Sequence, residues 1–384
     1  MKIALVHKKL DLNGGTERDL FRTAEGLRDL GHDVHLFCGE FEVSPPAGTT
    51  AHAVAVAPLG RTLRLWSFAL FAPRLVRRTS CDVMVNFGRL LSQDVLRCGG
   101  GSHRAFLDKF GRSAGVWRRF WQSVSPYHQS LLAMEKRQFR EGHYKAILAV
   151  SDEVKRELAS TYSVPAVRIK VIYNGVDHER FDPALREKFR ESVRRQWQIP
   201  SEAFMVLFVG SGFRRKGLDR LLEIWNAPAL KDVYLLVVGE DARRDRYIAW
   251  AQRQAPGRIV FTGRQSDIEQ YYAAADLVAL LAVQEAFGNV VLEALASGLP
   301  VVVSSTVGAA EVLKGNLASG IVADPRDPTE IVEKIVSMLP RSRDPRLRIE
   351  ARKLGEDYSW KNHFLRLQGF LQKIADQRRC ESCS

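Results

Sequence analysis

The sequence lacks the long apolar runs that membrane-spanning proteins carry. No uninterrupted apolar stretch of about 18 residues occurs in its 384 residues, which excludes a transmembrane helix of ordinary length. The first apolar stretch, residues 3–6, is too short for a secretory signal and is typical of a first β-strand. We therefore expect a chain that stays in the cytoplasm.

Cysteine is also scarce, with five in the chain. Cys38, Cys81 and Cys98 stand alone, so the sequence offers no disulfide framework. Cys380 and Cys383 form a C-x-x-C pair in a polar tail, where a zinc half-site is one interpretation. Further ligands and a redox βαβ context are missing around them, so a reduced, disordered tail is the favoured interpretation.

Two phosphate-binding signatures are incomplete. Gly14-Gly15 follows the first strand without the third glycine of a dinucleotide fingerprint, so NAD binding is poorly supported. Gly212 and Gly217 have the spacing of a P-loop, but Leu218 stands where that loop needs its lysine. The chain is therefore not predicted to be a P-loop nucleotidase.

Acidic residues are outnumbered, and the formal net charge is +13. Residues 61–145 contain sixteen Lys/Arg against five Asp/Glu, a net of +11, and aromatic residues are interleaved with them. Such a composition fits either a nucleic acid or an anionic membrane surface as the partner. No nucleic-acid-binding motif accompanies it. We therefore favour an anionic membrane surface or an anionic glycolipid.

Residues 103–143 concentrate this basic and aromatic character. Trp117, Phe120 and Trp121 recur at helical spacing beside arginines at positions 118 and 119. A helix of this kind can lie in the headgroup layer, with its rings in lipid and its arginines on phosphates. The alternative is a helix that packs its aromatic side chains on the domain core. We favour membrane contact.

Residues 284–304, QEAFGNVVLEALASGLPVVVS, carry the clearest functional pattern. Helical apolar spacing begins at about Asn289, Gly298 has the place of a left-handed C-terminal cap, and Pro300 follows where a helix cannot continue. Residues 301–303 are three valines and are typical of a buried strand. The segment therefore predicts a loop, a helix, a short turn and a strand.

The loop and helix of this segment can bind a phosphate between two polyols. Gly288 lets the backbone approach a ligand closely. Glu293 can accept hydrogen bonds from both hydroxyls of a ribose, and Glu285 can do the same for a hexose. Free N–H groups at the helix start suit a phosphate; they belong to Asn289, Val290 and Val291. The pattern describes a nucleotide sugar, and the alternative is an amphipathic helix with two solvated glutamates.

Strand and helix patterns alternate along the whole chain, which predicts an α/β fold with two Rossmann-like, doubly wound domains. We place the N-terminal domain at residues 1–173 and the C-terminal domain at 174–360. A final helix in 361–384 is expected to cross back to the first domain and to end in a polar tail. The strands are expected at residues 2–7, 33–38, 82–87, 146–151, 233–241, 258–264 and 276–282.

The motif from Glu285 to Val303 closely resembles the donor-site motif of retaining glycosyltransferases of family 4, E-G-F-G-x-x-x-L-E-A-M-A-x-G-x-P-V-V. Ala286 replaces the usual glycine, which stiffens the loop. The resemblance covers essentially the whole chain, more loosely in residues 40–145, and is closest to the lipopolysaccharide core glucosyltransferases. It implies the GT-B fold, with two domains that face each other across a cleft, one binding the acceptor and the other the donor.

The resemblance also implies roles for single residues. Arg215 and Lys216 match the basic pair that holds the donor pyrophosphate, and Asn174 opens an N-G-V-D hinge. For Asp19 the alternative is a solvated helix acid, and for His103 a structural histidine. The remaining donor contacts are expected at Gly14, Gly15, Gly210, Arg264 and Phe287. The catalytic residues are expected at Arg215, Lys216, Glu285, Asp19, Asp94 and His103, the last four near the reacting sugar.

These features predict a retaining hexosyltransferase. It would move a hexose, glucose being favoured, from a UDP-sugar to a lipopolysaccharide core or related glycolipid, on the inner face of the inner membrane. The main alternative is another donor, such as UDP-galactose, UDP-GlcNAc or GDP-mannose, with a polysaccharide or lipid-linked acceptor. A basic nucleic-acid-binding protein is a remote alternative that leaves Glu285 and Glu293 without a role.

No cofactor is expected, and no metal is required. The sequence contains no Asp-x-Asp, the metal-binding motif of the other large transferase fold. Arg215, Lys216 and the helix start at Asn289 can neutralise a departing diphosphate themselves. An epimerase would need a Tyr-x-x-x-Lys spacing, which is missing, and nothing marks a lysine for pyridoxal phosphate, as a glycan phosphorylase would need.

Overall fold

The computed structural model describes all residues except 13–14, 59, 106, 108–124 and 384. The chain divides into two compact units. The N-terminal unit comprises Met1–Ile172 together with His363–Ser384, and the C-terminal unit comprises Tyr173–Asn362. The acceptor-binding and donor-binding roles expected for the two parts of the chain stay predictions.

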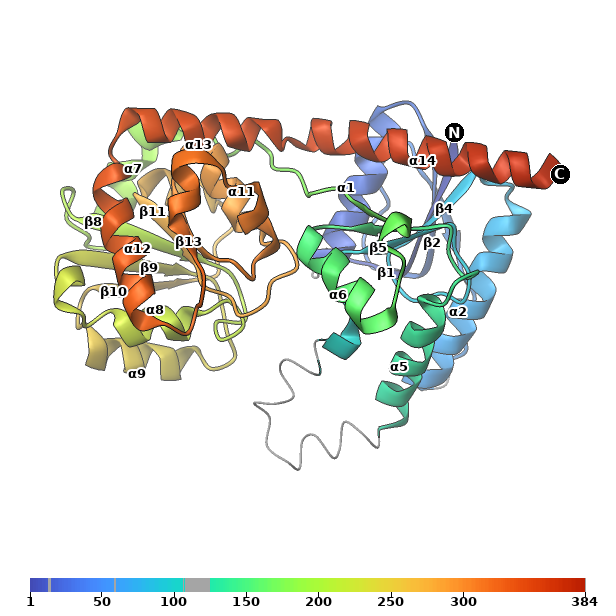
Figure 1. The fold of residues 1–384 in the computed structure, drawn as a ribbon, viewed down its shortest axis with the longest axis horizontal. Coiled ribbons are helices and arrows are strands. Elements are labelled where there is room, and N and C mark those ends of the chain that lie inside the picture. Colours follow the sequence, from blue (N-terminus) through green and yellow to red (C-terminus); the bar gives the residue numbers. More distant parts are fainter. Residues whose placement is uncertain (13–14, 59, 106, 108–124, 384) are drawn as a thin grey trace. The chain divides into compact units, whose positions relative to one another are not determined.

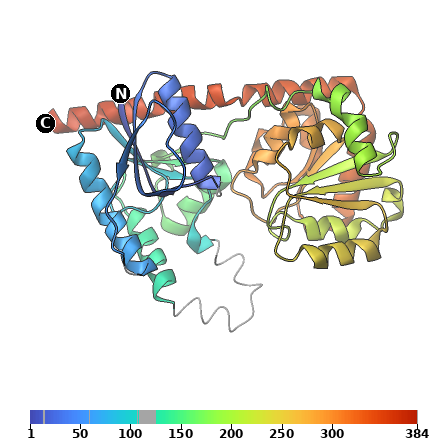
Figure 2. The same cartoon turned by 180° about the vertical axis from the view of Figure 1, so that it is seen from behind.

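The N-terminal unit is built on a seven-stranded sheet in the order β3-β2-β1-β4-β5-β6-β7. Every strand pair is parallel, and β1 lies between β2 and β4 (Figures 1 and 2). Its strands are β1 (Lys2–Leu10), β2 (Asp33–Phe41), β3 (Thr50–Ala53), β4 (Val83–Asn86), β5 (Val95–Cys98), β6 (Ala146–Ala149) and β7 (Ile169–Val171). Its helices are α1 (Gly15–Asp29), α2 (Arg61–Arg78), α5 (Pro126–Gln138), α6 (Asp152–Tyr162) and most of α14 (Trp360–Cys383), with a 3₁₀ turn at Ala166–Arg168.

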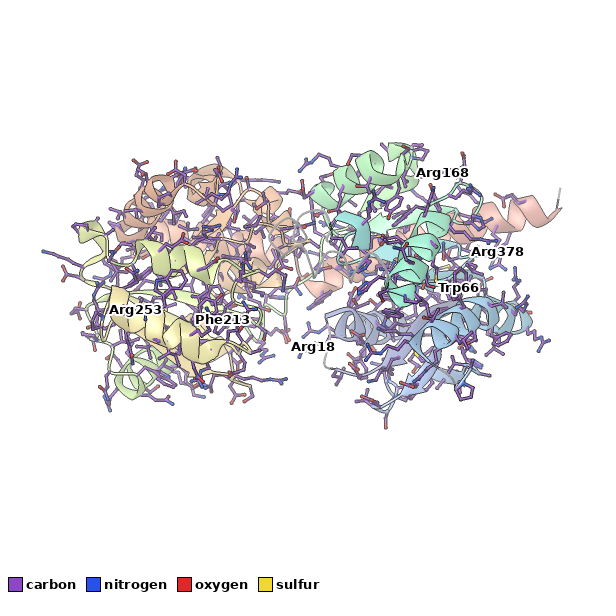
Figure 3. The ribbon with its side chains drawn as sticks, turned by 90° about the horizontal axis from the view of Figure 1, so that it is seen from below. Arg18, Trp66, Arg168, Phe213, Arg253 and Arg378 are labelled. Atoms are coloured by element: carbon purple, nitrogen blue, oxygen red, sulfur yellow. The ribbon has the colours of Figure 1, made fainter. Side chains whose placement is uncertain are left out.

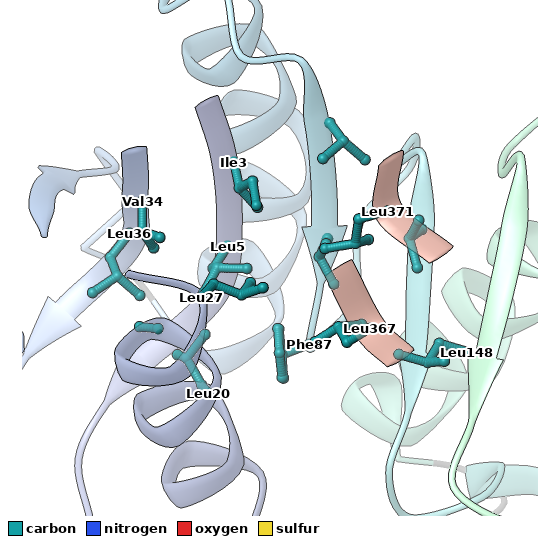
Figure 4. Close-up of a cluster of buried hydrophobic side chains, with 14 of the residues drawn as sticks. Ile3, Leu5, Leu20, Leu27, Val34, Leu36, Phe87, Leu148, Leu367 and Leu371 are labelled. Atoms are coloured by element: carbon teal, nitrogen blue, oxygen red, sulfur yellow. The ribbon is translucent and has the colours of Figure 1, made fainter. Parts of the chain in front are cut away.

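Both faces of this sheet are covered, because strand side chains alternate between them. Ile3 and Leu5 of β1 point to the face covered by α1 and α14, whereas Ala4 and Val6 point to the face covered by α2. Figure 4 shows Leu367 of α14 in the first of these cores, beside residues that come from much earlier in the chain. The last helix is therefore part of the core of the N-terminal unit.

The C-terminal unit repeats the architecture with a six-stranded parallel sheet in the order β10-β9-β8-β11-β12-β13. The two parallel sheets confirm the predicted pair of Rossmann-like domains. Its strands are β8 (Phe204–Val209), β9 (Val233–Val238), β10 (Ile259–Gly263), β11 (Leu277–Leu280), β12 (Val301–Ser304) and β13 (Ile321–Val322). Its α-helices are α7 (Leu185–Gln196), α8 (Leu218–Ile224), α9 (Arg244–Gln254), α10 (Glu269–Ala274), α11 (Asn289–Ala296), α12 (Pro328–Arg341) and α13 (Pro345–Asp357). Its 3₁₀ turns are Pro228–Leu230, Gly308–Val312 and Gly315–Gly320.

One buried carboxylate ties α7 to this sheet. Asp276 is fully buried and accepts hydrogen bonds from Arg186 at 2.9 Å, Arg190 at 3.0 Å and Arg194 at 2.7 Å. It also accepts the backbone N–H of Met205 at 2.9 Å. Burial raises the pKa of Asp276, but the neighbouring arginines outweigh it, so the pKa lies below its usual value. The carboxylate therefore stays ionised and keeps three guanidinium groups paired.

We expect Asp276→Asn to lower the free energy of unfolding by about 3–5 kcal/mol, because it leaves buried cations without their partner. Since the folded-state pKa is depressed, this contribution is present above the unfolded pKa and is lost as the pH falls below about 4. Urea denaturation at several pH values measures both effects. Asp324→Asn, which breaks an exposed pair with Arg326, is the control and should leave the midpoint unchanged. Equal midpoints for both variants would contradict the role of Asp276.

Candidate active site

The predicted donor residues gather at one edge of the C-terminal sheet. In parallel sheets, ligands bind beyond the carboxyl ends of the strands, where the strand order reverses. Here the reversal lies between β8 and β11, which are neighbours in the sheet although three helices and two strands separate them in sequence. The loops that follow β8 and β11 carry the basic pair and the two glutamates.

Glycines shape the loop that follows β8. Gly210 has a φ of 145°, and a Cβ there would meet the side chain of Lys216 at 2.5 Å. Gly217 has a φ of 81°, and a Cβ there would lie 2.0 Å from the carbonyl oxygen of Leu281, just after β11. Buried Phe213 (Figure 3) is fixed by its backbone N–H, which donates to Asp241 at 2.9 Å. The loop is thus held against the ends of the neighbouring strands.

The basic pair of this loop lies beside the first glutamate. The Arg215 guanidinium forms an ion pair with Glu285. Burial lowers the pKa of the Lys216 ammonium, an effect that Glu285 opposes and Arg215 adds to. Glu293 also acts on this pKa, so both glutamates lie within electrostatic range of Lys216. Two cations and two carboxylates therefore share one small region.

Helix α11 opens toward this region without a side-chain cap. Its N-cap, Gly288, has a φ of 91°, and a Cβ there would lie 2.9 Å from Val307. The N–H groups of Asn289 and Val290 belong to the first turn and have no intrahelical acceptor. The N–H of Val291 was expected to be free as well, but it donates to the Gly288 carbonyl at 3.0 Å. Two of the three predicted phosphate donors are therefore available.

The second glutamate is held by a tyrosine that the sequence did not reveal. Glu293 Oε2 accepts a hydrogen bond from the Tyr272 hydroxyl at 2.6 Å. Burial, together with the charge of Glu293, raises the pKa of Tyr272 well above its usual value, so the hydroxyl keeps its proton. Tyr272 is fully buried and packs edge-on against Phe181. The tyrosine thereby fixes the direction of a half-buried carboxylate.

The remaining donor residues of this unit lie around the same strand ends. Phe287 is buried and stacks on Tyr173 with ring centroids 6.0 Å apart. Arg264 follows β10 and is exposed. Asn174, of the expected hinge, donates from its amide to Asn289 Oδ1 at 2.9 Å.

Comparison with known proteins adds to this geometry. Residues 13–180 match the family model described as Glycosyltransferase Family 4, and residues 189–354 match that of Glycosyl transferases group 1. The lipopolysaccharide glucosyltransferase WaaG of Escherichia coli (strain K12) is 26% identical over 334 residues, which cover 86% of this chain and 87% of that protein. This chain is a family 4 glycosyltransferase. It is therefore an enzyme, a hexosyltransferase.

Solved structures agree in fold. A crystal structure of WaaG, described as a glycosyltransferase involved in lipopolysaccharide biosynthesis, matches with a TM-score of 0.75 and 23% identity over 97% of this chain and 98% of that one. The Anabaena protein Alr3699/HepE in complex with UDP-glucose matches with a TM-score of 0.69 and 19% identity over 97% and 100%. These likenesses confirm the GT-B fold of the glycosyltransferase.

In the N-terminal unit of the glycosyltransferase, Asp19 has a strong partner. Gly14 lies outside the described residues, and exposed Gly15 opens α1. Asp19, on α1, pairs with Arg97 of β5, whose Nη2 donates to Oδ1 at 3.0 Å. Arg97 is 4% exposed, and Gly99 lies next to the pair. Asp19 is therefore not the solvated helix acid that was the alternative interpretation.

Asp94 lies at the opposite edge of this sheet from the place expected of a catalytic acid. It precedes β5, at the amino end of the strand, and accepts hydrogen bonds from the N–H of Met84 at 2.9 Å and from Arg378 of α14 at 3.2 Å (Figure 3). Ligands bind at the carboxyl ends of such strands. This placement supports a structural role, the attachment of α14, in place of the predicted catalytic one.

His103 follows β5 at the carboxyl edge of the sheet. Its Nε2 lies 3.3 Å from His128 Nδ1, with the two rings stacked, and burial lowers the pKa of its imidazole. Its backbone N–H donates to Glu135 at 2.7 Å. Glu135, which sequence reasoning missed, also receives Arg89 at 3.1 Å and the Tyr162 hydroxyl at 2.6 Å. In the sequence, Glu135 looks like any glutamate of an amphipathic helix, so its several buried hydrogen bonds could not be predicted.

We expect Tyr272→Phe to weaken UDP binding by roughly three- to tenfold, because Glu293 loses the hydrogen bond that orients it. Calorimetric titration of UDP into the full chain measures this. Tyr271→Phe, a neighbouring buried tyrosine whose hydroxyl is not bonded to Glu293, is the matched control. If both variants lose affinity equally, the effect comes from core packing and the positioning role is wrong.

Proposed function

We propose that this glycosyltransferase moves a hexose, glucose being favoured, from a UDP-sugar to an anionic lipopolysaccharide-core or related glycolipid acceptor, with retention at the anomeric carbon. The observation that carries the proposal is the grouping of Arg215, Lys216, Glu285 and Glu293 at the start of α11. WaaG, a lipopolysaccharide glucosyltransferase by name, and a HepE complex with UDP-glucose support the choice of acceptor and donor.

The chemistry of the step follows from the charges in this region. In the proposed transfer, the bond between the anomeric carbon and the diphosphate oxygen breaks, and a bond to an acceptor oxygen forms on the same face. The acceptor proton passes to the departing diphosphate. Negative charge grows on that diphosphate, and Arg215, Lys216 and the first N–H groups of α11 stabilise it. Glu293 binds the ribose and Glu285 the hexose.

We propose that no metal ion takes part. Two fixed cations and a helix N-terminus supply the positive charge that a divalent ion would otherwise provide. Within the part of the chain that the structure describes, no group of three or more His, Cys, Asp or Glu side chains is placed to hold a metal. Turnover in excess EDTA should therefore equal turnover with added magnesium.

A donor screen tests the substrate. UDP-glucose, UDP-galactose, UDP-GlcNAc and GDP-mannose are each incubated with a lipopolysaccharide acceptor that lacks its outer core, and product is followed by mass spectrometry. We expect transfer from UDP-glucose with the anomeric configuration retained. Transfer from another donor would identify the alternative substrate. No transfer from any donor, combined with salt-sensitive DNA binding in a gel shift, would favour the nucleic-acid alternative.

Lys216→Ala should lower kcat roughly a hundredfold or more while changing donor affinity much less, because the charge it stabilises develops in the transition state. Steady-state kinetics over a range of donor concentrations separate the two constants. Lys231→Ala, an exposed lysine of the same unit, is the control. A variant with normal kcat and only a raised KM would show that Lys216 serves ground-state binding.

We further propose that the enzyme is cytoplasmic and sits on the inner face of the inner membrane. No described helix is long and apolar enough to span a bilayer. Of the segment 103–143 favoured for membrane contact, Trp117, Phe120, Trp121 and the two arginines beside them lie outside the described residues.

Helix α2 supports the membrane proposal with described residues. Leu63, Leu70 and Phe71 are 56%, 41% and 43% exposed on its outer face. Trp66, labelled in Figure 3, lies on the same helix. The helix contains five arginines and no acidic residue. Exposed apolar side chains flanked by arginines suit an anionic headgroup layer.

The double variant Leu63→Ser/Phe71→Ser should reduce binding to liposomes that contain anionic lipid, because it removes the apolar part of the contact. Wild-type binding should weaken between low and high salt. Co-sedimentation measures both. Ile349→Ser/Leu365→Ser, at two similarly exposed apolar positions elsewhere, is the control. Equal binding of the wild type to neutral vesicles would contradict the electrostatic part of the proposal.

A further inference from the structure

A cavity of about 570 Å³ opens at the carboxyl edge of the N-terminal sheet. It lies beside β1 and β4, the neighbours between which the strand order reverses, and this is where parallel sheets bind ligands. Phe87 and Tyr127 offer it aromatic surfaces. Six basic side chains line the cavity, against Glu40 and Glu135 on the acidic side. The basic residues are Lys8, Lys9, Arg61, Arg64, Arg89 and Arg97.

One buried group of this cavity lacks a partner. His7, in β1, is 4% exposed, and its Nδ1 has no hydrogen-bond partner among the described residues. Its other nitrogen, Nε2, lies 3.3 Å from Glu17 Oε1, on α1. A buried polar atom without a partner costs free energy. Nδ1 is therefore placed to bind a ligand rather than to stabilise the fold.

Glu17 orients the imidazole ring of His7 by binding its Nε2. The hydrogen bond from His7 lowers the pKa of Glu17, with its burial opposing the shift, so the carboxylate stays ionised and acts as an acceptor. His7 Nε2 therefore carries a proton that it donates to this carboxylate, and Nδ1 is the ring nitrogen left for a ligand. A hydroxyl group can hydrogen-bond to Nδ1 in either direction, because a hydroxyl both donates and accepts.

The opening to Nδ1 is kept clear by a glycine. A Cβ on Gly88 would lie 3.1 Å from His7 Nδ1, in the place where a ligand atom would come to rest. Three hydrogen bonds fix the backbone of Gly88. Its N–H donates to Asn86 at 2.8 Å, and its carbonyl accepts from Asn86 at 3.2 Å and from Gln138 at 2.9 Å.

We propose that this cavity binds the sugar acceptor, and that His7, oriented by Glu17, forms a hydrogen bond to one acceptor hydroxyl through Nδ1. The ligand class is a polyol that carries negative charge. Sugars supply hydroxyl groups, and Lys8 and Arg61 of the lining form no ion pair within the described residues, so they can attract an anion. The assignment rests on the proposed function, because it names the acceptor subsite of the same transfer. His7 is a specificity-determining residue of that subsite.

Binding experiments with three variants test the assignment. The probe is core oligosaccharide released from lipopolysaccharide, titrated calorimetrically into the full chain. His7→Gln keeps a donor for Glu17 but removes the group at Nδ1, and should weaken binding roughly three- to tenfold. Gly88→Ala should weaken it similarly while leaving both His7 and Glu17 in place. His7→Asn restores an acceptor near Nδ1 and should recover part of the affinity.

Controls separate this effect from general damage. Gly369→Ala adds a methyl group that meets nothing within 4 Å, and should bind the oligosaccharide like the wild type. UDP affinity should be unchanged in all variants. In ¹⁵N NMR spectra of the wild type, the probe should shift the Nδ1 resonance of His7. This signal reads out the contact even where a variant fails to fold.

The outcomes distinguish the two levels of the proposal. If the wild type binds the oligosaccharide and neither His7→Gln nor Gly88→Ala weakens it, the assignment of His7 is overturned and the proposed function stands. If the wild type does not bind the probe, the cavity is not its subsite. If the donor screen shows no transfer, the proposed function fails, and the titration and the Nδ1 shift still decide whether His7 binds a sugar.

Discussion

Both sheets consist of parallel strands alone, and this single constraint decides where chemistry can occur. Parallel pairing brings the carboxyl ends of all strands to one edge, so the loops that leave those ends meet although they are far apart in sequence. In the C-terminal unit this edge collects the loop after β8 and the start of α11. In the N-terminal unit it collects the cavity beside β1 and β4. At the amino edge of the N-terminal sheet, polar residues instead attach helices, as Asp94 does when it accepts a hydrogen bond from Arg378 of α14.

Charges at the donor edge interact with each other, and Lys216 also donates to the backbone carbonyl of Val209 at 3.5 Å. Arg215 binds Glu285, and Lys216 lies within range of Glu285 and Glu293. In the proposed transfer, an entering diphosphate takes over these cations, and the glutamates then need hydroxyl donors in their place. A nucleotide sugar offers phosphate and hydroxyls together, whereas an inorganic phosphate offers no polyol. The internal pairing thus favours a ligand that satisfies both sets of groups at once.

Local pattern was enough to predict the secondary structure of residues 284–304. The loop, helix, turn and strand of 284–304 follow from Gly288, Gly298, Pro300 and apolar spacing, which act over neighbouring residues. Asp94 was misjudged because the edge on which a residue lies depends on where its strand begins, and the polar loop before β5 hides that start. The hydrogen bond of Val291 to Gly288 arises from a tight first turn that spacing does not reveal.

Long-range pairs could not be predicted. Arg97 and Asp19 are 78 positions apart, and Tyr272 and Glu293 are 21 apart, so their meeting depends on how whole strands and helices pack. His7 gave a weak local signal, a polar residue directly after the apolar run of residues 3–6. The sequence could not show that Glu17 contacts Nε2 of this histidine or that Gly88 lies next to its Nδ1.

The membership of α14 in the N-terminal core sets an order of events during synthesis. Leu367, Leu371, Ile374 and Ala375 are almost completely buried beside residues of β1 and α1, which leave the ribosome hundreds of residues earlier. The C-terminal unit, in contrast, is continuous in sequence and needs no segment from elsewhere in the chain to complete its core. The N-terminal unit lacks α14, which covers part of one face of its sheet beside α1, until the end of the chain has been made. Domains made first usually fold first, but in this chain the last helix completes the first domain.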